Sequence, residues 1–224
     1  MQATSLKPKG YKGMGMEGVV ARWYARIRRT DSQMEDWTKQ AEELTKNLPS
    51  GAAVLEVAPG PGYFAVEMAR RGRFHVTGLD ISHTFVEIAR DNARKAGVTV
   101  DFQEGDASRM PFGDESFDLI ICQAAFKNFS RPEQVLNEMY RVLRAGGTAV
   151  IQDMSKDAST ADIDDEVSRM RLGSLNAFMT RQSLRALQRR AYTPAQFRAL
   201  AAASAFGGCE IETSGIGMDV RLTR

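Results

Sequence analysis

Residues 54–69 of the chain read VLEVAPGPGYFAVEMA. This stretch begins as a short apolar run, passes through alternating glycine and proline, and continues with helix-forming residues. This order predicts a strand, a tight turn and a helix. A glycine-rich corner between a strand and a helix typically holds a nucleotide-like ligand at the helix N-terminus. Several unrelated cofactors use such a corner, so the rest of the sequence has to discriminate between them.

Further strand and helix units follow along the chain. Strands are expected at residues 53–57, 75–80, 98–103, 117–122 and 148–154. Helices are expected after the first, second and fourth of these strands, which predicts a parallel sheet covered on both faces. Past residue 154 the pattern indicates a helical insertion over about 160–191, a helix capped by Thr193, and a terminal hairpin. The predicted fold is α/β and Rossmann-like: a seven-stranded, mostly parallel sheet with a terminal antiparallel hairpin and a helical cap.

Composition narrows the class of protein. The 224 residues are 43% hydrophobic and 26% charged, with a formal net charge of +2, as in an ordinary globular domain. No apolar run approaches the roughly 20 residues of a membrane span, and the near-neutral charge argues against dedicated nucleic-acid binding. Only Cys122 and Cys209 are present, so we expect a reducing, cytoplasmic location. A homodimer is left open.

The amino-terminal segment is locally basic. Its cationic residues, against the single Glu17, are Lys7, Lys9, Lys12, Arg22, Arg26, Arg28 and Arg29. A solvated helix face is the simpler interpretation, and a site that attracts an anionic substrate is the alternative.

The glycine motif alone leaves two cofactors open. Residues 60–65 fit the G-x-G-x-x-A pattern of dinucleotide enzymes, and Asp80 lies at the distance expected for a ribose-binding carboxylate. Glu56, however, lies in the middle of an expected buried strand, where an ionisable carboxylate is costly unless a cationic or polar group compensates it. A carboxylate there would repel a diphosphate but suits a ligand with an amino group or a sulfonium. An NAD(P)-dependent reductase therefore remains only as an alternative.

Four stretches in order resemble the class I S-adenosylmethionine-dependent methyltransferases: VLEVAPGPG, TGLD, EGDASRMPFGDESFDLIIC and VLNEMYRVLRAGGTAVI. The resemblance covers roughly residues 50–153 and is strongest to the small-molecule branch related to the quinone-biosynthesis enzymes. It implies a methyltransferase domain over residues 49–224, preceded by a helical cap segment over residues 1–48. It also implies S-adenosylmethionine as the cofactor, S-adenosylhomocysteine as the product and a small organic molecule as the methyl acceptor.

The resemblance also implies roles for individual positions in cofactor binding. These are the amino-acid end for Glu56, Ala58, Pro59, Gly60 and Gly62, the ribose for Asp80, the adenine for Ile81, Asp106 and Ala107, and the methyl region for Gln123. The alternative for Asp80 is a charge at a helix N-terminus, and for Asp106 a turn-forming aspartate.

The sequence departs from the family pattern in two places. Ala58 stands where the family loop usually begins with glycine, which we expect to be tolerated if its backbone φ is negative. The stretch AAFKNF, residues 124–129, carries Lys127 and Asn128 where relatives often have a histidine pair. Lys127 is expected to be a solvated side chain, or to pair with an anionic acceptor.

Methyl transfer from a sulfonium is an in-line displacement, so alignment and exclusion of water supply much of the catalysis and a dedicated base is optional. The catalytic candidates near the acceptor are Asn128, Asp153 and Tyr24. Loop capping is the alternative for Asp153, and packing between helices for Tyr24. No metal-ligand cluster is visible, so no metal is expected.

Residues 162–190 are the expected substrate-determining lid, through Met170, Leu172, Leu175, Phe178 and Met179. Packing in the core is nevertheless the favoured interpretation for most of these side chains, because apolar residues at helical spacing are usually buried. A last alternative is a non-catalytic S-adenosylmethionine-binding module that partners another subunit, motivated by Ala58, the missing histidine pair and the lack of an obvious base.

Overall fold

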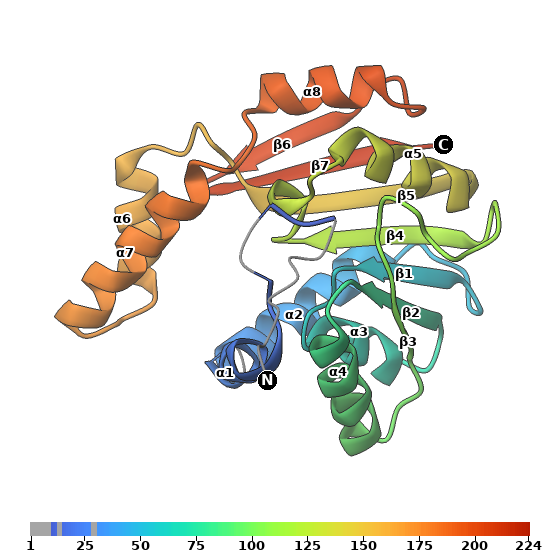
Figure 1. The fold of residues 1–224 in the computed structure, drawn as a ribbon, viewed down its shortest axis with the longest axis horizontal. Helices are drawn as coiled ribbons and strands as arrows, with labels where there is room; N and C mark the ends of the chain where they lie inside the picture. Colours follow the sequence, from blue (N-terminus) through green and yellow to red (C-terminus); the bar gives the residue numbers. More distant parts are fainter. Residues whose placement is uncertain (1–9, 13–14, 28–30) are drawn as a thin grey trace, which may run out of the picture.

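A seven-stranded sheet organises the chain (Figure 1). The computed structural model describes residues 10–12, 15–27 and 31–224, and its strands run in the order β3-β2-β1-β4-β5-β7-β6. The strands are β1 (Ala53–Val57), β2 (His75–Asp80), β3 (Asp101–Glu104), β4 (Phe117–Gln123), β5 (Leu143–Met154), β6 (Glu210–Ser214) and β7 (Gly217–Thr223). The first five pair in parallel, and β7 pairs antiparallel with β5 and β6. The predicted mostly parallel sheet with a terminal hairpin is confirmed.

Helices cover both faces of the sheet. They are α1 (Gly18–Ile27), α2 (Asp31–Thr45), α3 (Tyr63–Arg70), α4 (His83–Ala96), the short 3-10 helix η1 (Phe126–Asn128), α5 (Pro132–Val142), α6 (Thr160–Arg169), α7 (Ser174–Gln188) and α8 (Pro194–Ala203). Alternate strand residues feed two separate cores. Val54 packs with α3 and α4, whereas Leu55 and Val57 pack with α5 and α8. Glu56 therefore points to the α3 side.

Local end signals behave as the sequence predicts. Gly97 ends α4 in the left-handed conformation at φ 68°. Pro132 lies in the first turn of α5, and Thr193 caps α8 in a capping box with Gln196. Each signal depends only on neighbours in the chain, which is why it is readable without the fold.

Two boundaries were wrong. The third strand begins at Asp101 rather than at residue 98. Helix α5 ends at Val142, and β5 begins at Leu143, five positions before the expected strand start at residue 148. The reason is a tertiary contact: the guanidinium of the C-terminal Arg224 donates to the carbonyl oxygens of Tyr140, Arg141 and Leu143 at 3.1, 3.0 and 2.6 Å. Arg224 thus supplies hydrogen-bond donors for carbonyl oxygens that the end of a helix leaves without partners.

The predicted helical insertion is a hairpin of α6 and α7 that projects from one end of the sheet (Figure 1). The expectation that its apolar side chains are mostly buried was wrong. Met170, Leu172, Leu175, Phe178 and Met179 are between 39% and 75% exposed. One side of α7 packs on α6. The apolar side chains at helical spacing lie on the other side of α7 and are exposed.

Candidate functional site

The site is built at the carboxyl ends of β1, β2, β4 and β5, and its central group is Glu56. This carboxylate is 3% exposed, and its Oε2 atom has no hydrogen-bond partner among the described residues. Burial raises the pKa of Glu56 from 4.5 to about 8; a backbone hydrogen bond from Ala65 lowers it in part, and the charge of Asp80 raises it further. A buried carboxylate oxygen without a partner is costly, and a cationic donor would compensate it.

The loop after β1 brings backbone close to that position. Ala58, Gly60 and Gly62 all have left-handed φ angles, of 58°, 55° and 75°. The expectation of a negative φ at Ala58 was therefore wrong: the alanine occupies a glycine-like conformation, held by its N–H donating to Leu79 O at 2.8 Å. At Gly62 a side chain has no room, because an added Cβ would lie 2.6 Å from Phe102.

Asp80 ties this loop to the end of β2. Its Oδ2 accepts the Gly60 N–H and its Oδ1 accepts the Ser82 N–H, each at 2.9 Å. Burial raises the pKa of Asp80 to about 6, although these backbone donors lower it. Asp80 is thus held rigidly by backbone donors at the end of β2, and its two carboxylate oxygens suit a vicinal diol. The alternative of a mere helix N-terminal charge is less fitting, because Ser82 already caps α4.

The three adenine candidates are placed differently from one another. Ile81 is partly exposed directly after β2. Asp106 forms a turn by accepting the N–H and hydroxyl of Ser108, and it pairs with Arg131 at 2.8 Å. Ala107 is buried in the core. Asp106 thus has the geometry of the turn-forming alternative. Because its carboxylate is engaged, any contact with an adenine edge would come from the backbone around Asp106.

Gln123 belongs to a group of three amides that sequence reasoning did not find. Its Nε2 donates to Gln40 Oε1 at 2.7 Å and to Gln152 Oε1 at 2.9 Å, and Gln40 Nε2 donates to Gln152 Oε1 at 2.7 Å. The three residues come from β4, α2 and β5. They link the helical cap segment to the sheet edge beside the expected methyl position.

Lys127 and Asp153 form a buried ion pair, which corrects the expectation of a solvated Lys127 and agrees with the loop-capping alternative for Asp153. Lys127 is not solvated: its side chain and that of Asp153 are 5% and 4% exposed, and Nζ lies 2.6 Å from Oδ1. Asp153 also accepts the backbone N–H groups of Lys127 and Met154. Its carboxylate is committed to charge pairing and loop capping, which argues against a catalytic base. Asn128, next in η1, is buried with an unpartnered Oδ1.

Tyr11 reaches the site from the N-terminal segment, and the sequence carried no signal for it. Residues 10–12 pair with residues 128–130: Lys12 N–H donates to Asn128 O at 2.7 Å, and Tyr11 bridges Phe129. Burial raises the pKa of the Tyr11 phenol; Arg190 lowers it, and Tyr24, Asp80 and Asp153 raise it. The backbone pairing with residues 128–130 holds Tyr11 beside η1, on the acceptor side of the edge.

Tyr24 packs as its alternative predicted. Its ring meets Phe85 of α4 edge-on, with centroids 5.9 Å apart. A second role over a bound cofactor stays a prediction. Of the basic N-terminal residues, Lys12, Arg22 and Arg26 are exposed, and Lys7, Lys9, Arg28 and Arg29 lie outside the described residues.

These features fit S-adenosylmethionine. The ammonium of its methionine end could donate to the unpartnered Oε2 atom of Glu56. The left-handed loop lets the backbone approach the ligand closely. The carboxylate of Asp80 could accept hydrogen bonds from the ribose hydroxyls. Within the described residues no group of three or more His, Cys, Asp or Glu side chains could hold a metal.

Comparison with known proteins agrees with the site. A family model described as a methyltransferase domain matches residues 55–151. Together with the sheet order and the carboxylates in the last residues of β1 and β2, this match defines the class. The chain belongs to the class I S-adenosylmethionine-dependent methyltransferases.

Particular relatives lie in the quinone-biosynthesis branch. The chain is 39% identical over 107 residues to a demethylmenaquinone methyltransferase of Deinococcus radiodurans, covering 47% of this chain and 44% of the relative. It is 33% identical over 156 residues to a ubiquinone/menaquinone biosynthesis C-methyltransferase of Geotalea daltonii, covering 67% and 66%. The chain thus spans about half to two thirds of the length of these relatives.

A solved structure shows the same fold over nearly the whole chain. It is described as a putative S-adenosylmethionine-dependent methyltransferase from Methanococcus maripaludis, with a TM-score of 0.71, 18% identity and 95% coverage of both chains.

Proposed function

We propose that this protein transfers the methyl group of S-adenosylmethionine to a small organic acceptor. The observation that carries the proposal is the buried Oε2 atom of Glu56, which has no hydrogen-bond partner among the described residues and lies near the end of β1, before the left-handed loop. A diphosphate brings only acceptors and negative charge, so it cannot supply the cationic donor that this buried oxygen lacks, which is why an NAD(P)-dependent reductase is not supported. When bound, S-adenosylmethionine supplies an electrophilic methyl group on a sulfonium.

The chain's own residues then bind, orient and exclude water. Glu56 is proposed to hold the ammonium, and Asp80 the ribose hydroxyls. The ammonium would also keep Glu56 ionised, reversing its raised pKa. Gln123, held by Gln40 and Gln152, is proposed to line the methyl region, and Tyr11 to orient an oxygen of the acceptor. The buried ion pair of Lys127 and Asp153 holds η1 against the end of β5. We propose that this pair helps to align the acceptor and does not transfer a proton.

For the acceptor we propose a ring of the quinol type, methylated on carbon. The support is the printed names of the relatives from Deinococcus radiodurans and Geotalea daltonii. A quinol ring carbon is activated by the ring's own hydroxyl groups, so this acceptor suits a site whose Asp153 is engaged with Lys127. In the balanced step the carbon gains the methyl group, the donor leaves as S-adenosylhomocysteine, and the proton of that carbon passes to solvent water as the ring regains its aromaticity.

The first test is calorimetry of the whole chain with S-adenosylmethionine and with S-adenosylhomocysteine. Binding of both is expected, together with weaker binding by Glu56→Gln and unchanged binding by Glu133→Gln, an exposed residue of α5. Absence of binding by either ligand at millimolar concentration contradicts the proposal. Thermal stabilisation by NADH but not by S-adenosylmethionine would instead select the reductase.

The second test separates an enzyme from a cofactor-binding module. Methyl-labelled S-adenosylmethionine is incubated with a panel of hydroquinones, phenols, amines and thiols, and the products are located by mass spectrometry. Labelled carbon on a hydroquinone ring supports the full proposal. Label on oxygen, nitrogen or sulfur keeps the methyltransferase and removes the quinol acceptor, and binding without any turnover favours the module.

A further inference from the structure

Helix α7 carries its large apolar side chains on the outside. None of its residues is buried. Leu175, Phe178 and Met179 are 75%, 53% and 57% exposed, and their spacing of three and four residues places them on one side of the helix. Leu184, on the other side, packs in the small cluster that contains Ile163 of α6. The helix is held by one side and presents an apolar stripe on the other.

The same stripe continues with basic side chains. Arg185 and Arg189 lie seven and eleven residues after Phe178, which is two and three helical turns, so they are on this side of α7. Residues 170–190 contain five arginines and no acidic residue. Arg181 is paired with Asp164 of α6, whereas Arg185 and Arg189 have no ion pair in the part of the chain that the structure describes. The outer side of α7 is therefore both apolar and cationic.

Helix α1 is turned in the same unusual way. Its buried residues are the small Ala21 and Ala25. Val19, Trp23 and Ile27, one turn apart, are instead 79%, 61% and 48% exposed. Burying large apolar side chains stabilises a fold more than burying alanine does, so a helix with this orientation has left its best packing surface outside.

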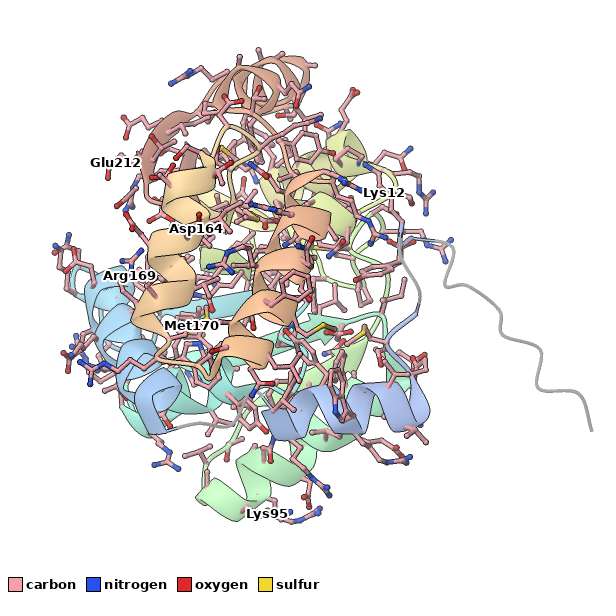
Figure 2. All side chains as sticks on the ribbon, turned by 90° about the vertical axis from the view of Figure 1, so that its left-hand side faces the viewer. Lys12, Lys95, Asp164, Arg169, Met170 and Glu212 are labelled. Atoms are coloured by element: carbon pink, nitrogen blue, oxygen red, sulfur yellow. The ribbon has the colours of Figure 1, made fainter. Side chains whose placement is uncertain are left out.

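The outer side of α1 is cationic as well. Arg22 and Arg26 are exposed beside the apolar side chains, and α1 contains no acidic residue. Figure 2, which looks at the molecule from the end where α6 and α7 project, shows α1 and this hairpin on the near side, with Met170 at the hairpin tip. Met170 and Leu172 are 43% and 39% exposed. We call the outward sides of α1 and α7, with residues 170–172, the outer face.

From this combination we propose that the outer face docks on the surface of an anionic lipid bilayer. Apolar side chains of amphipathic helices enter the boundary between headgroups and acyl chains, while arginines between them meet lipid phosphates. Among the described residues no helix combines the length and the apolar composition of a membrane span. The charge on α1 and α7 is the complement of such a surface.

Other occupants fit the outer face less well. A second copy meeting it symmetrically would bring the arginines of both α1 and α7 helices together without acidic partners on the face, and such contacts are repulsive. Nucleic acid would satisfy the arginines but would leave Leu175, Phe178 and Trp23 in water. Both occupants are outcomes that the experiment below separates from a bilayer.

The experiment is vesicle co-sedimentation of the full chain, with phosphatidylcholine alone or with phosphatidylglycerol added. Vesicles without quinone are used and no cofactor is present, so failure here leaves the proposed methyl transfer untouched. Binding is expected only with phosphatidylglycerol and should weaken as salt is raised. The Arg185→Gln/Arg189→Gln variant is expected to bind about 25-fold more weakly, at about fivefold for each arginine near an anionic surface. Arg109→Gln/Arg198→Gln, which removes two exposed arginines elsewhere, is the charge-matched control.

Fluorescence separates insertion from charge attraction. In a Trp37→Phe background Trp23 is the only tryptophan, because the chain has two, and its emission is expected to shift to the blue on anionic vesicles. Phe178→Ser/Met179→Ser should weaken binding while circular dichroism stays unchanged. The proposal is overturned by equal losses in both arginine variants, by a Trp23 spectrum that does not move, or by vesicle-independent dimerisation through these residues. Competition of nucleic acid for the protein without vesicle binding would also overturn it.

Discussion

Glu56→Gln is the substitution with the most specific expected outcome, because it should raise stability and lower cofactor affinity at once. Glutamine keeps the shape of the buried side chain and removes its charge. The pKa of Glu56 is raised by burial from 4.5 in the unfolded chain to about 8 in the fold. Between these values the folded state holds a proton that the unfolded state has lost, so the free energy of unfolding falls as pH rises, by about 1.4 kcal/mol per pH unit.

The useful window lies between pH 6 and 8. Asp80, whose pKa is raised from 3.8 to about 6, contributes its own loss of stability below this window. His83, whose pKa is raised by its hydrogen bond to Glu104, titrates in wild type and variant alike and cancels in their difference. Across the window Glu56 should lower the free energy of unfolding of the ligand-free wild type by about 2 kcal/mol, and Glu56→Gln should lack this loss.

Affinity should move in the opposite direction. Loss of a charged hydrogen-bonding partner for the ammonium is worth about 1.5 to 3 kcal/mol, so Glu56→Gln should bind S-adenosylmethionine roughly 10- to 100-fold more weakly. The assays are urea unfolding at a series of pH values and calorimetry, with Glu133→Gln as the exposed control. If the variant keeps the wild-type pH slope, or binds the cofactor equally well, the role assigned to the unpartnered Oε2 atom is refuted.

Four further outcomes are expected. Asp80→Asn should weaken S-adenosylmethionine binding by about 1 to 3 kcal/mol in calorimetry, because an amide cannot accept from two hydroxyls and two backbone donors; unchanged affinity would exclude the ribose role. Ala58→Gly should raise the free energy of unfolding by about 0.5 to 1 kcal/mol in urea, because relief of left-handed strain exceeds the added chain entropy; a loss would contradict the strain. Lys127→Met should lower the free energy of unfolding by about 3 to 5 kcal/mol, because it leaves Asp153 charged and buried. The double variant Lys127→Met/Asp153→Leu should recover part of this loss, and a double variant no more stable than Lys127→Met would speak against the pairing. Tyr11→Phe should lower the methyl-transfer rate about tenfold, the worth of one hydrogen bond, with cofactor affinity preserved; a fall in affinity alone would place the phenol on the cofactor instead.

The strand, turn and helix around Glu56, and the order of the units that follow, were predictable from the amino-acid sequence. These depend on periodicity and on caps such as Gly97 and Thr193, in which each residue interacts with near neighbours. The chemical meaning of Glu56 was also readable, because a carboxylate inside an apolar strand needs a partner wherever the strand lies. The carboxyl edge of a parallel sheet then brought Glu56 and Asp80 together.

The distant segments that complete the edge could not be predicted in this way, because packing brings them there. Tyr11 reaches it by pairing with residues 128–130, Gln40 by crossing from α2, and Lys127 by meeting Asp153 from the next strand of the sheet. None of these contacts has a local signature, since each joins residues that only packing makes neighbours. The orientation of α7 was decided in the same way. A stripe of apolar residues at helical spacing says that one side of a helix differs from the other, but whether that side faces the core or the surroundings depends on what the rest of the chain places against it.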